Sequence, residues 1–168
     1  MIYGFGLYGM GGYLTDPVEY SFSQRVKELG VNIANSPYLD TEVSTIVTTI
    51  NKLPHSDKVI LWGSSLGANN LPYIASYIAR EVEGIWGFQA SLYGMHFPIP
   101  QNVKFAHEVY NSTIPQTLGL GAYKWTKAQN NKITNLYLSD RHDMHPGETE
   151  GSQEMFLREM ERVTKGLS

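Results

Sequence analysis

The sequence contains no cysteine, which excludes disulfide bonds, thiolate metal sites and a cysteine nucleophile, and leaves the redox compartment open. Charge is also sparse, because charged residues make up 17% of the 168 residues and leave a formal net charge of −3 at pH 7. Lysine and arginine are scattered rather than clustered, so no extended positive field forms. We therefore expect no nucleic acid among the partners.

Long apolar runs are missing as well. No segment approaches the roughly 18 consecutive apolar residues that a membrane span needs, and the N-terminus lacks the charged start and apolar stretch of a secretion signal. We expect a soluble chain without a membrane span, with the cytoplasm as its default location. Nothing in the sequence fixes the oligomeric state.

The apolar content is ordinary for a globular protein, at 42% of the residues. A chain of 168 residues suits one compact core and leaves little room for a second. We therefore expect residues 1–168 to form a single minimal domain.

Short apolar runs that predict strands alternate with amphipathic stretches that predict helices. The strands are expected at residues 1–6, 31–34, 59–62, 85–88, 103–110 and 133–138. The helices are expected at 21–29, from Asp40 or Thr41 up to Pro54, at 66–80 and at 152–163. This alternation predicts an α/β fold with a parallel sheet and helices on both faces, whose active sites lie at the carboxyl ends of the strands.

The segment Gly63-Ser64-Ser65-Leu66-Gly67 fits the pattern G-x-S-x-G between the strongest predicted strand and a good helix. A nucleophile on so sharp a turn has a strained backbone, and glycines two residues before and after it remove side-chain clashes. The helix that follows directs its N-terminal N–H groups to the same place. The pattern favours Ser65 as a nucleophile over the alternative of a plain glycine turn with serine caps, and Ser64 is expected to fill the turn.

In this context the chain resembles the α/β-hydrolase superfamily, and Gly63 to Ala68 with the helix after them is similar to its nucleophile elbow. Tyr3-Gly4-Phe5-Gly6 is similar to the family's His-Gly-x-Gly segment. The resemblance implies an oxyanion hole made by the backbone N–H groups of Phe5 and Leu66. It also implies a compact α/β-hydrolase core without a cap domain, like the small lidless cutinase-like and phage-encoded esterases, although cutinase-like members usually carry disulfides.

A serine nucleophile needs a base, and histidine is the usual one. His142 and His145 follow the last predicted strand, where the resemblance implies the catalytic histidine. Spacing alone leaves both open, and we prefer His142 because it follows the strand most closely. His55, His96 and His107 are expected to be structural or solvated.

The acid departs from the family pattern, which takes an aspartate from the loop after the preceding strand. That loop reads Asn111-Ser112-Thr113 and holds no carboxylate. Asp140 and Asp143 each stand two residues before a histidine, so either can orient it in an extended segment. We assign Asp140, with Asp143 and Asn111 as alternatives, and expect Glu108 at a surface or ladder position.

Metal and phosphate sites are the remaining possibilities. His142, Asp143, His145 and Glu148 hold ligand atoms, but no spaced helical pair of the H-E-x-x-H kind is present. The glycine-rich stretch from Gly4 to Gly12 lacks the G-K-[ST] ending of a phosphate loop. We therefore expect no metal and no cofactor.

These observations predict an esterase that works through an acyl-enzyme intermediate. An open cleft suits lipid and polymeric esters as well as small ones, and its expected lining is apolar: Tyr8, Met10, Tyr13, Tyr93, Met95 and Phe97. The alternatives are a non-catalytic binding or assembly protein with the same fold, and an acyltransferase.

Overall fold

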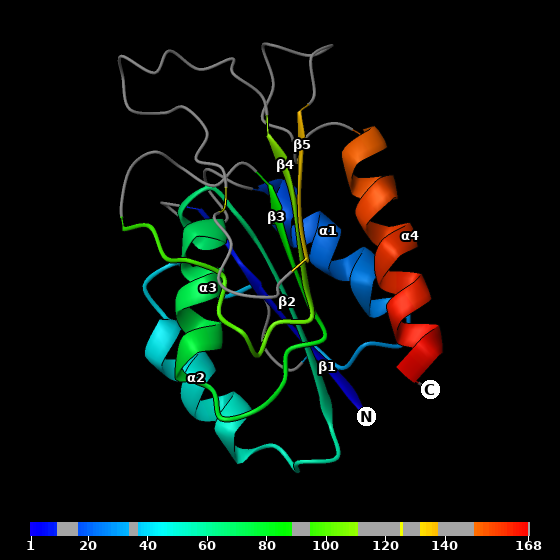
Figure 1. Ribbon diagram of the computed structural model, residues 1–168. Coiled ribbons are helices and arrows are strands. Elements are labelled where there is room, and N and C mark those ends of the chain that lie inside the picture. Colours follow the sequence, from blue (N-terminus) through cyan, green and yellow to red (C-terminus); the bar gives the residue numbers. More distant parts are fainter. Residues whose placement is uncertain are drawn as a thin grey trace.

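Five parallel strands form one sheet in the order β1-β2-β3-β4-β5 (Figure 1). This computed structural model describes residues 1–9, 17–33, 37–88, 95–110, 125, 132–137 and 150–167. The strands are β1 (Ile2–Leu7), β2 (Lys58–Ser64), β3 (Gly84–Phe88), β4 (Phe105–Tyr110) and β5 (Lys132–Tyr137). Because every pair is parallel, the carboxyl ends of all five strands meet at one edge of the sheet.

Helices cover both faces of this sheet. The helices α2 (Val43–Lys52) and α3 (Leu66–Tyr77) lie on one face, and α1 (Pro17–Lys27) and α4 (Glu150–Leu167) lie on the other (Figure 1). Within the described residues no helix has the length and apolarity needed to cross a membrane. The predicted α/β fold with a parallel sheet and helices on both faces is therefore confirmed.

Strand β2 runs through the centre of the core, and its side chains alternate between the two faces. Val59 and Leu61 belong to the apolar cluster beneath α2 and α3, whereas Ile60 and Trp62 belong to the cluster beneath α1 and α4. All four are fully buried. A central strand of a parallel sheet has this character because helices cover both of its sides.

Strand β1 ends at Leu7, one residue later than the sequence predicts, and it contains Gly4 and Gly6. A Cβ atom on Gly4 would lie 2.5 Å from the Trp62 ring, and one on Gly6 would also overlap that ring. The indole of Trp62 therefore occupies the space above two glycines of the neighbouring strand. At these two positions glycine permits close packing. It does not mark a bend of the chain, which is another common reason for glycine in a strand.

In the described part of the strand expected at 31–34, Asn32 forms an isolated bridge with Tyr3. Tyr38 pairs with Leu7 further along the same edge of β1. Backbone hydrogen bonds of 3.0 Å from Gly4 N to Asn32 O and of 2.8 Å from Tyr8 N to Tyr38 O secure the two contacts. Asn32 and Tyr38 therefore cover the edge of β1 at two points.

A buried hydrogen bond fastens α1 to the centre of the sheet. The indole N–H of Trp62 donates to Ser23 Oγ over 3.0 Å, and both side chains are fully buried.

We expect Ser23→Ala to lower the free energy of unfolding by about 1–3 kcal/mol, because the buried indole N–H loses its acceptor. Urea denaturation measures this effect, and Ser76→Ala on an exposed face of α3 is the matched control, for which we expect a change within about 0.5 kcal/mol. Equal losses in the two variants would contradict this role of Ser23.

Candidate active site

Ser65 stands between the end of β2 and the first residue of α3, with backbone angles φ 53° and ψ −119°. Among the described residues it is the one non-glycine residue with a positive φ. Such a conformation costs on the order of 1–3 kcal/mol and persists only where the surroundings enforce it. The serine of the G-x-S-x-G pattern is therefore the strained residue of the described chain.

Two backbone hydrogen bonds hold Ser65 in this conformation. Its N–H donates to the carbonyl of Phe88 at the end of β3 over 2.9 Å, and its carbonyl accepts from Asn69 N in α3 over 3.2 Å. The first bond ties the turn to the sheet, and the second begins the helix. The side chain of Ser65 is half-buried, whereas Ser64 beside it is buried at 3% exposure.

The two glycines of the pattern allow the helix to approach the sheet closely. A Cβ atom on Gly63 would lie 2.8 Å from the backbone carbon of Gly67, and one on Gly67 would lie 2.5 Å from the carbonyl oxygen of Tyr8. Both contacts are shorter than a real Cβ atom tolerates, and both involve backbone that cannot rotate away. The glycines therefore bring the start of α3 against the carboxyl ends of β1 and β2.

Phe5 is not at the loop where the resemblance places its donor. It lies inside β1 opposite Leu61, four residues before Ser65 along the neighbouring strand. At about 3.3 Å per residue this is roughly 13 Å from the level of Ser65. The expectation of an oxyanion-hole donor at Phe5 is wrong, because β1 continues to Leu7 and the backbone level with Ser65 comes after Tyr8. Leu66 is the first residue of α3, as expected.

The predicted base and acid lie outside the described residues. This applies to Asp140 and His142 and to their alternatives, which are Asn111, Asp143 and His145. The described chain resumes on either side of them, since β5 ends at Tyr137 and α4 begins at Glu150. The four residues weighed as possible metal ligands, His142, Asp143, His145 and Glu148, also fall in this gap. No group of three potential ligands occurs in the part of the chain that the structure describes.

The other three histidines lie at structural or exposed positions, as the sequence predicts. His55 and His96 are exposed. His107 lies in β4, where its Nδ1 is 3.2 Å from Glu159 Oε2 and its ring stacks on Trp86 at a centroid distance of 6.4 Å. These contacts join β4 to α4 and leave His107 as a structural residue.

Glu108 is a buried carboxylate close to the candidate site. Glu108 lies in strand β4, which agrees with the predicted position in a strand ladder. Its side chain is only 1% exposed, so the alternative of a surface position is excluded. It is level with Gly87 in the next strand, and the ring of Trp125 occupies the space where a Gly87 side chain would be. Because Ala68 of α3 borders the same space, Glu108 belongs to the face of the sheet that α3 covers.

A second buried carboxylate, Glu19, comes from the first turn of α1 and is 1% exposed. Ser23, one helical turn later, is level with Trp62 because it accepts the indole hydrogen bond. One turn of about 5.4 Å therefore places Glu19 near the level of Ser64 on the α1 face. The helix predicted at residues 21–29 begins after Glu19, so no sequence signal marked this residue.

A hollow of about 350 Å³ opens beside the turn. It reaches from Leu66 along α3 to Tyr73 and is closed by Met95 and Phe97, two residues of the expected cleft lining. Tyr8 is buried, while Met10, Tyr13 and Tyr93 lie outside the described residues.

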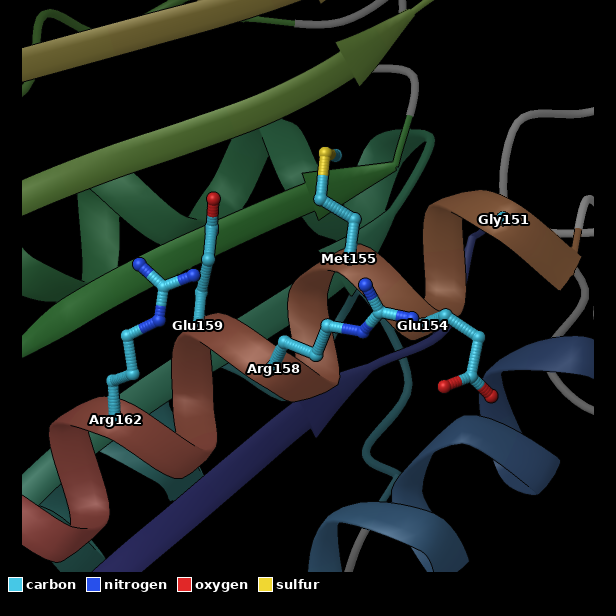
Figure 2. Close-up of a pocket in the computed structure, with 6 residues that line it drawn as sticks. All are labelled: Gly151, Glu154, Met155, Arg158, Glu159 and Arg162. Carbon is cyan, nitrogen blue, oxygen red and sulfur yellow. The ribbon is translucent and has the colours of Figure 1, made fainter.

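A larger hollow of about 600 Å³ lies on the opposite face along α4, between charged side chains such as Glu154, Arg158 and Arg162 (Figure 2). It is remote from Ser65.

No model of a known protein family matches the sequence, and no curated protein matches it. Two solved structures share the fold over nearly their whole length. One is a proposed hydrolase of the alpha/beta superfamily from Xanthomonas campestris pv. campestris, with a TM-score of 0.55, 11% identity, and coverage of 98% of this chain and 96% of that one. The other is a proposed YdeN-like hydrolase from Pectobacterium atrosepticum, with a TM-score of 0.59, 13% identity, and coverage of 99% and 92%. The chain therefore has the fold of these α/β-hydrolase-like proteins.

Proposed function

We propose that the protein is a small serine hydrolase of carboxylic esters, with Ser65 as its nucleophile. The observation that carries the proposal is the strained backbone of Ser65, at φ 53° on a strand-to-helix turn. Strain of this kind persists where function requires a side chain to be presented at one point. The fold of the two neighbours and the G-x-S-x-G pattern support the same assignment.

In the proposed reaction His142 takes the proton of Ser65 while the serine oxygen attacks the ester carbonyl, and Asp140 orients the histidine. The reach of the chain supports this. Three strand spacings of about 4.8 Å separate β2 from β5, which is roughly 14 Å. His142 comes five residues after Tyr137, and five extended residues span about 17 Å.

The negative charge of the tetrahedral intermediate needs backbone donors. Ser65 N–H is already engaged with Phe88, so the first N–H of α3 that is oriented for this role is that of Leu66. The positive end of the helix dipole adds to its effect. We assign the second donor to the backbone that follows Tyr8, because Tyr8 N–H is bound to Tyr38 and the Tyr8 carbonyl lies against Gly67.

Glu108 is the second candidate for the acid. Its burial on the α3 face beneath the strand ends is the specific observation that favours it over an ordinary surface residue. Asp140→Asn should lower kcat/KM by roughly 10³- to 10⁴-fold if Asp140 orients the histidine, as removal of the acid does in other triads. The same loss in Glu108→Gln, with Asp140→Asn near wild type, would move the acid to Glu108.

Hydrolysis of p-nitrophenyl butyrate tests the proposal. We expect turnover by the wild type, a loss of at least about 10⁴-fold in Ser65→Ala, and a butyryl adduct of the wild type after an acid quench. Added methanol separates hydrolase from acyltransferase, because a transferase would form methyl butyrate in preference to butyrate. The absence of turnover with any ester, together with the absence of an adduct, would favour the alternative of a binding or assembly protein.

A further inference from the structure

A groove runs between α2 and α3 and begins at Leu66, the residue after the candidate nucleophile. It consists of two adjoining hollows of about 350 and 400 Å³, which share Val43 and Tyr73 as lining residues. The first hollow starts at Leu66, the residue after Ser65, and the second ends at Tyr77. We call the two together the α2–α3 groove.

The floor and walls of the α2–α3 groove are largely apolar. Tyr73 packs edge-on against Tyr77 at a centroid distance of 4.8 Å, and its ring is tilted against that of Phe97 at 4.6 Å. Met95 in the first hollow and Tyr77 in the second remain 72% and 60% exposed, so the groove presents large apolar side chains to its surroundings. Met95 adds a flexible side chain that adapts to the shape of a ligand.

The polar groups in the groove are mostly uncharged, and they include the amides of Asn69 and Asn70 and the hydroxyls of Thr41 and Ser44. Among the described residues that line it, Asp40 carries the one formal charge, and neither lysine, arginine nor histidine is present. A hydrogen bond to Tyr77 raises the pKa of Tyr73, so its hydroxyl stays uncharged at neutral pH. An acidic or phosphorylated ligand would meet only the negative charge of Asp40.

The length of the groove suits a chain rather than a compact group. It follows α3 from Leu66 to Tyr77, and at about 1.5 Å per residue this is roughly 16 Å. Leu66, at one end of the groove, is the residue directly after Ser65. A ligand whose carbonyl carbon lies at Ser65 Oγ would therefore place a linear substituent along the groove.

The two hollows are continuous, their walls are largely apolar, and no described residue that lines them is cationic. We therefore infer that the α2–α3 groove binds the uncharged alkyl chain of a medium-chain acyl ester. This inference rests on the proposed esterase function and deepens it by naming the substrate class. Each methylene that enters the groove should raise kcat/KM about two- to fourfold, as burial of apolar surface predicts. The gain should stop when the groove is full.

Blocking the far half of the groove tests the inference. Ser44 lines the second hollow and is exposed on α2, so Ser44→Trp should fill that half without disturbing the core. Thr48→Trp is the matched control, because Thr48 is exposed on the same helix and does not line the groove. The substrates are p-nitrophenyl acetate, butyrate, octanoate and decanoate below their micellar concentrations.

We expect Ser44→Trp to lower kcat/KM for the decanoate at least about tenfold and to leave the acetate unchanged, whereas Thr48→Trp should match the wild type on every ester. An unchanged ratio of decanoate to acetate in Ser44→Trp would overturn the inference. It would leave the proposed esterase function intact, because the acetate reports on Ser65 alone.

A binding measurement separates the groove from catalysis. Nile red is an uncharged apolar dye, and Ser65→Ala should bind it and release it on addition of 1-decanol, while Ser44→Trp should bind it at least about tenfold more weakly. Binding that follows this pattern without turnover of any ester would support the groove and contradict the proposed reaction. Equal binding of dye by Ser44→Trp and Thr48→Trp would contradict the groove.

Discussion

Replacing Ser65 by glycine is expected to abolish ester hydrolysis and at the same time to make the protein more stable than Ser65→Ala by about 1–2 kcal/mol. Glycine adopts φ 53° and ψ −119° without the side-chain clash that alanine keeps, so the strain of about 1–3 kcal/mol is relieved. Part of that gain is offset, because glycine loses more conformational freedom on folding. Urea denaturation of the two variants measures the difference, and p-nitrophenyl butyrate measures activity.

The prediction that Ser65→Gly is more stable than Ser65→Ala is informative because the opposite order is usual in helices. At an ordinary helical position glycine is less stable than alanine by about 1 kcal/mol. Thr48, which is exposed in the middle of α2, has such a position, so Thr48→Gly should be less stable than Thr48→Ala, opposite to the order at Ser65. If glycine is the less stable replacement at both positions, the strain assigned to Ser65 is absent.

His142→Ala is expected to lower kcat/KM for p-nitrophenyl butyrate by roughly 10⁴-fold or more, which is the usual size of the effect when the base of a nucleophilic serine is removed. His145→Ala should retain activity within about tenfold of the wild type. Added imidazole should restore part of the activity of His142→Ala, because a small base can enter the space that the side chain leaves. A merely structural histidine would not respond in this way.

The reverse order, with His145→Ala inactive and His142→Ala near wild type, would transfer the base to His145. Asp143, which stands two residues before His145, would then become the expected acid. Full activity in both variants would contradict a base in this segment altogether. Circular dichroism of each variant keeps a folding defect apart from a loss of catalysis.

The strand-to-helix turn at Ser65 was predictable because its signals are local. A strand of four apolar residues, a glycine-flanked serine and a helix follow one another within the segment from Val59 to Tyr77. The parallel sheet was predictable for a related reason, since alternating strand and helix patterns leave few arrangements. In both cases neighbours in the sequence decide the structure.

The errors concern residues whose role is decided by partners far along the chain. Tyr3-Gly4-Phe5-Gly6 is similar to an oxyanion-hole segment in its local pattern, but in the structure the Trp62 ring packs on its two glycines inside β1, which places Phe5 away from the site. Burial of Glu108 depends in the same way on the approach of α3 and Trp125. A single sequence does not show which distant side chain fills a given space.

The α2–α3 groove also depends on such contacts. Val43 and Val47 have the spacing of an inner helical face, and the sequence predicts them as core residues. Their half-buried positions beside Tyr73 follow from the distance between two helices that β2 separates in the chain. Helix packing leaves a groove where the side chains do not fill the space between the axes.

The most direct test of the central claim is intact-protein mass spectrometry after treatment with a fluorophosphonate, comparing the wild type with Ser65→Ala and Ser64→Ala. An activated serine reacts with this probe, whereas an ordinary serine does not. We predict one adduct on the wild type and on Ser64→Ala, and none on Ser65→Ala. An adduct that persists in Ser65→Ala, or a wild type that stays unlabelled at high probe concentration, would contradict the assignment of Ser65 as the nucleophile.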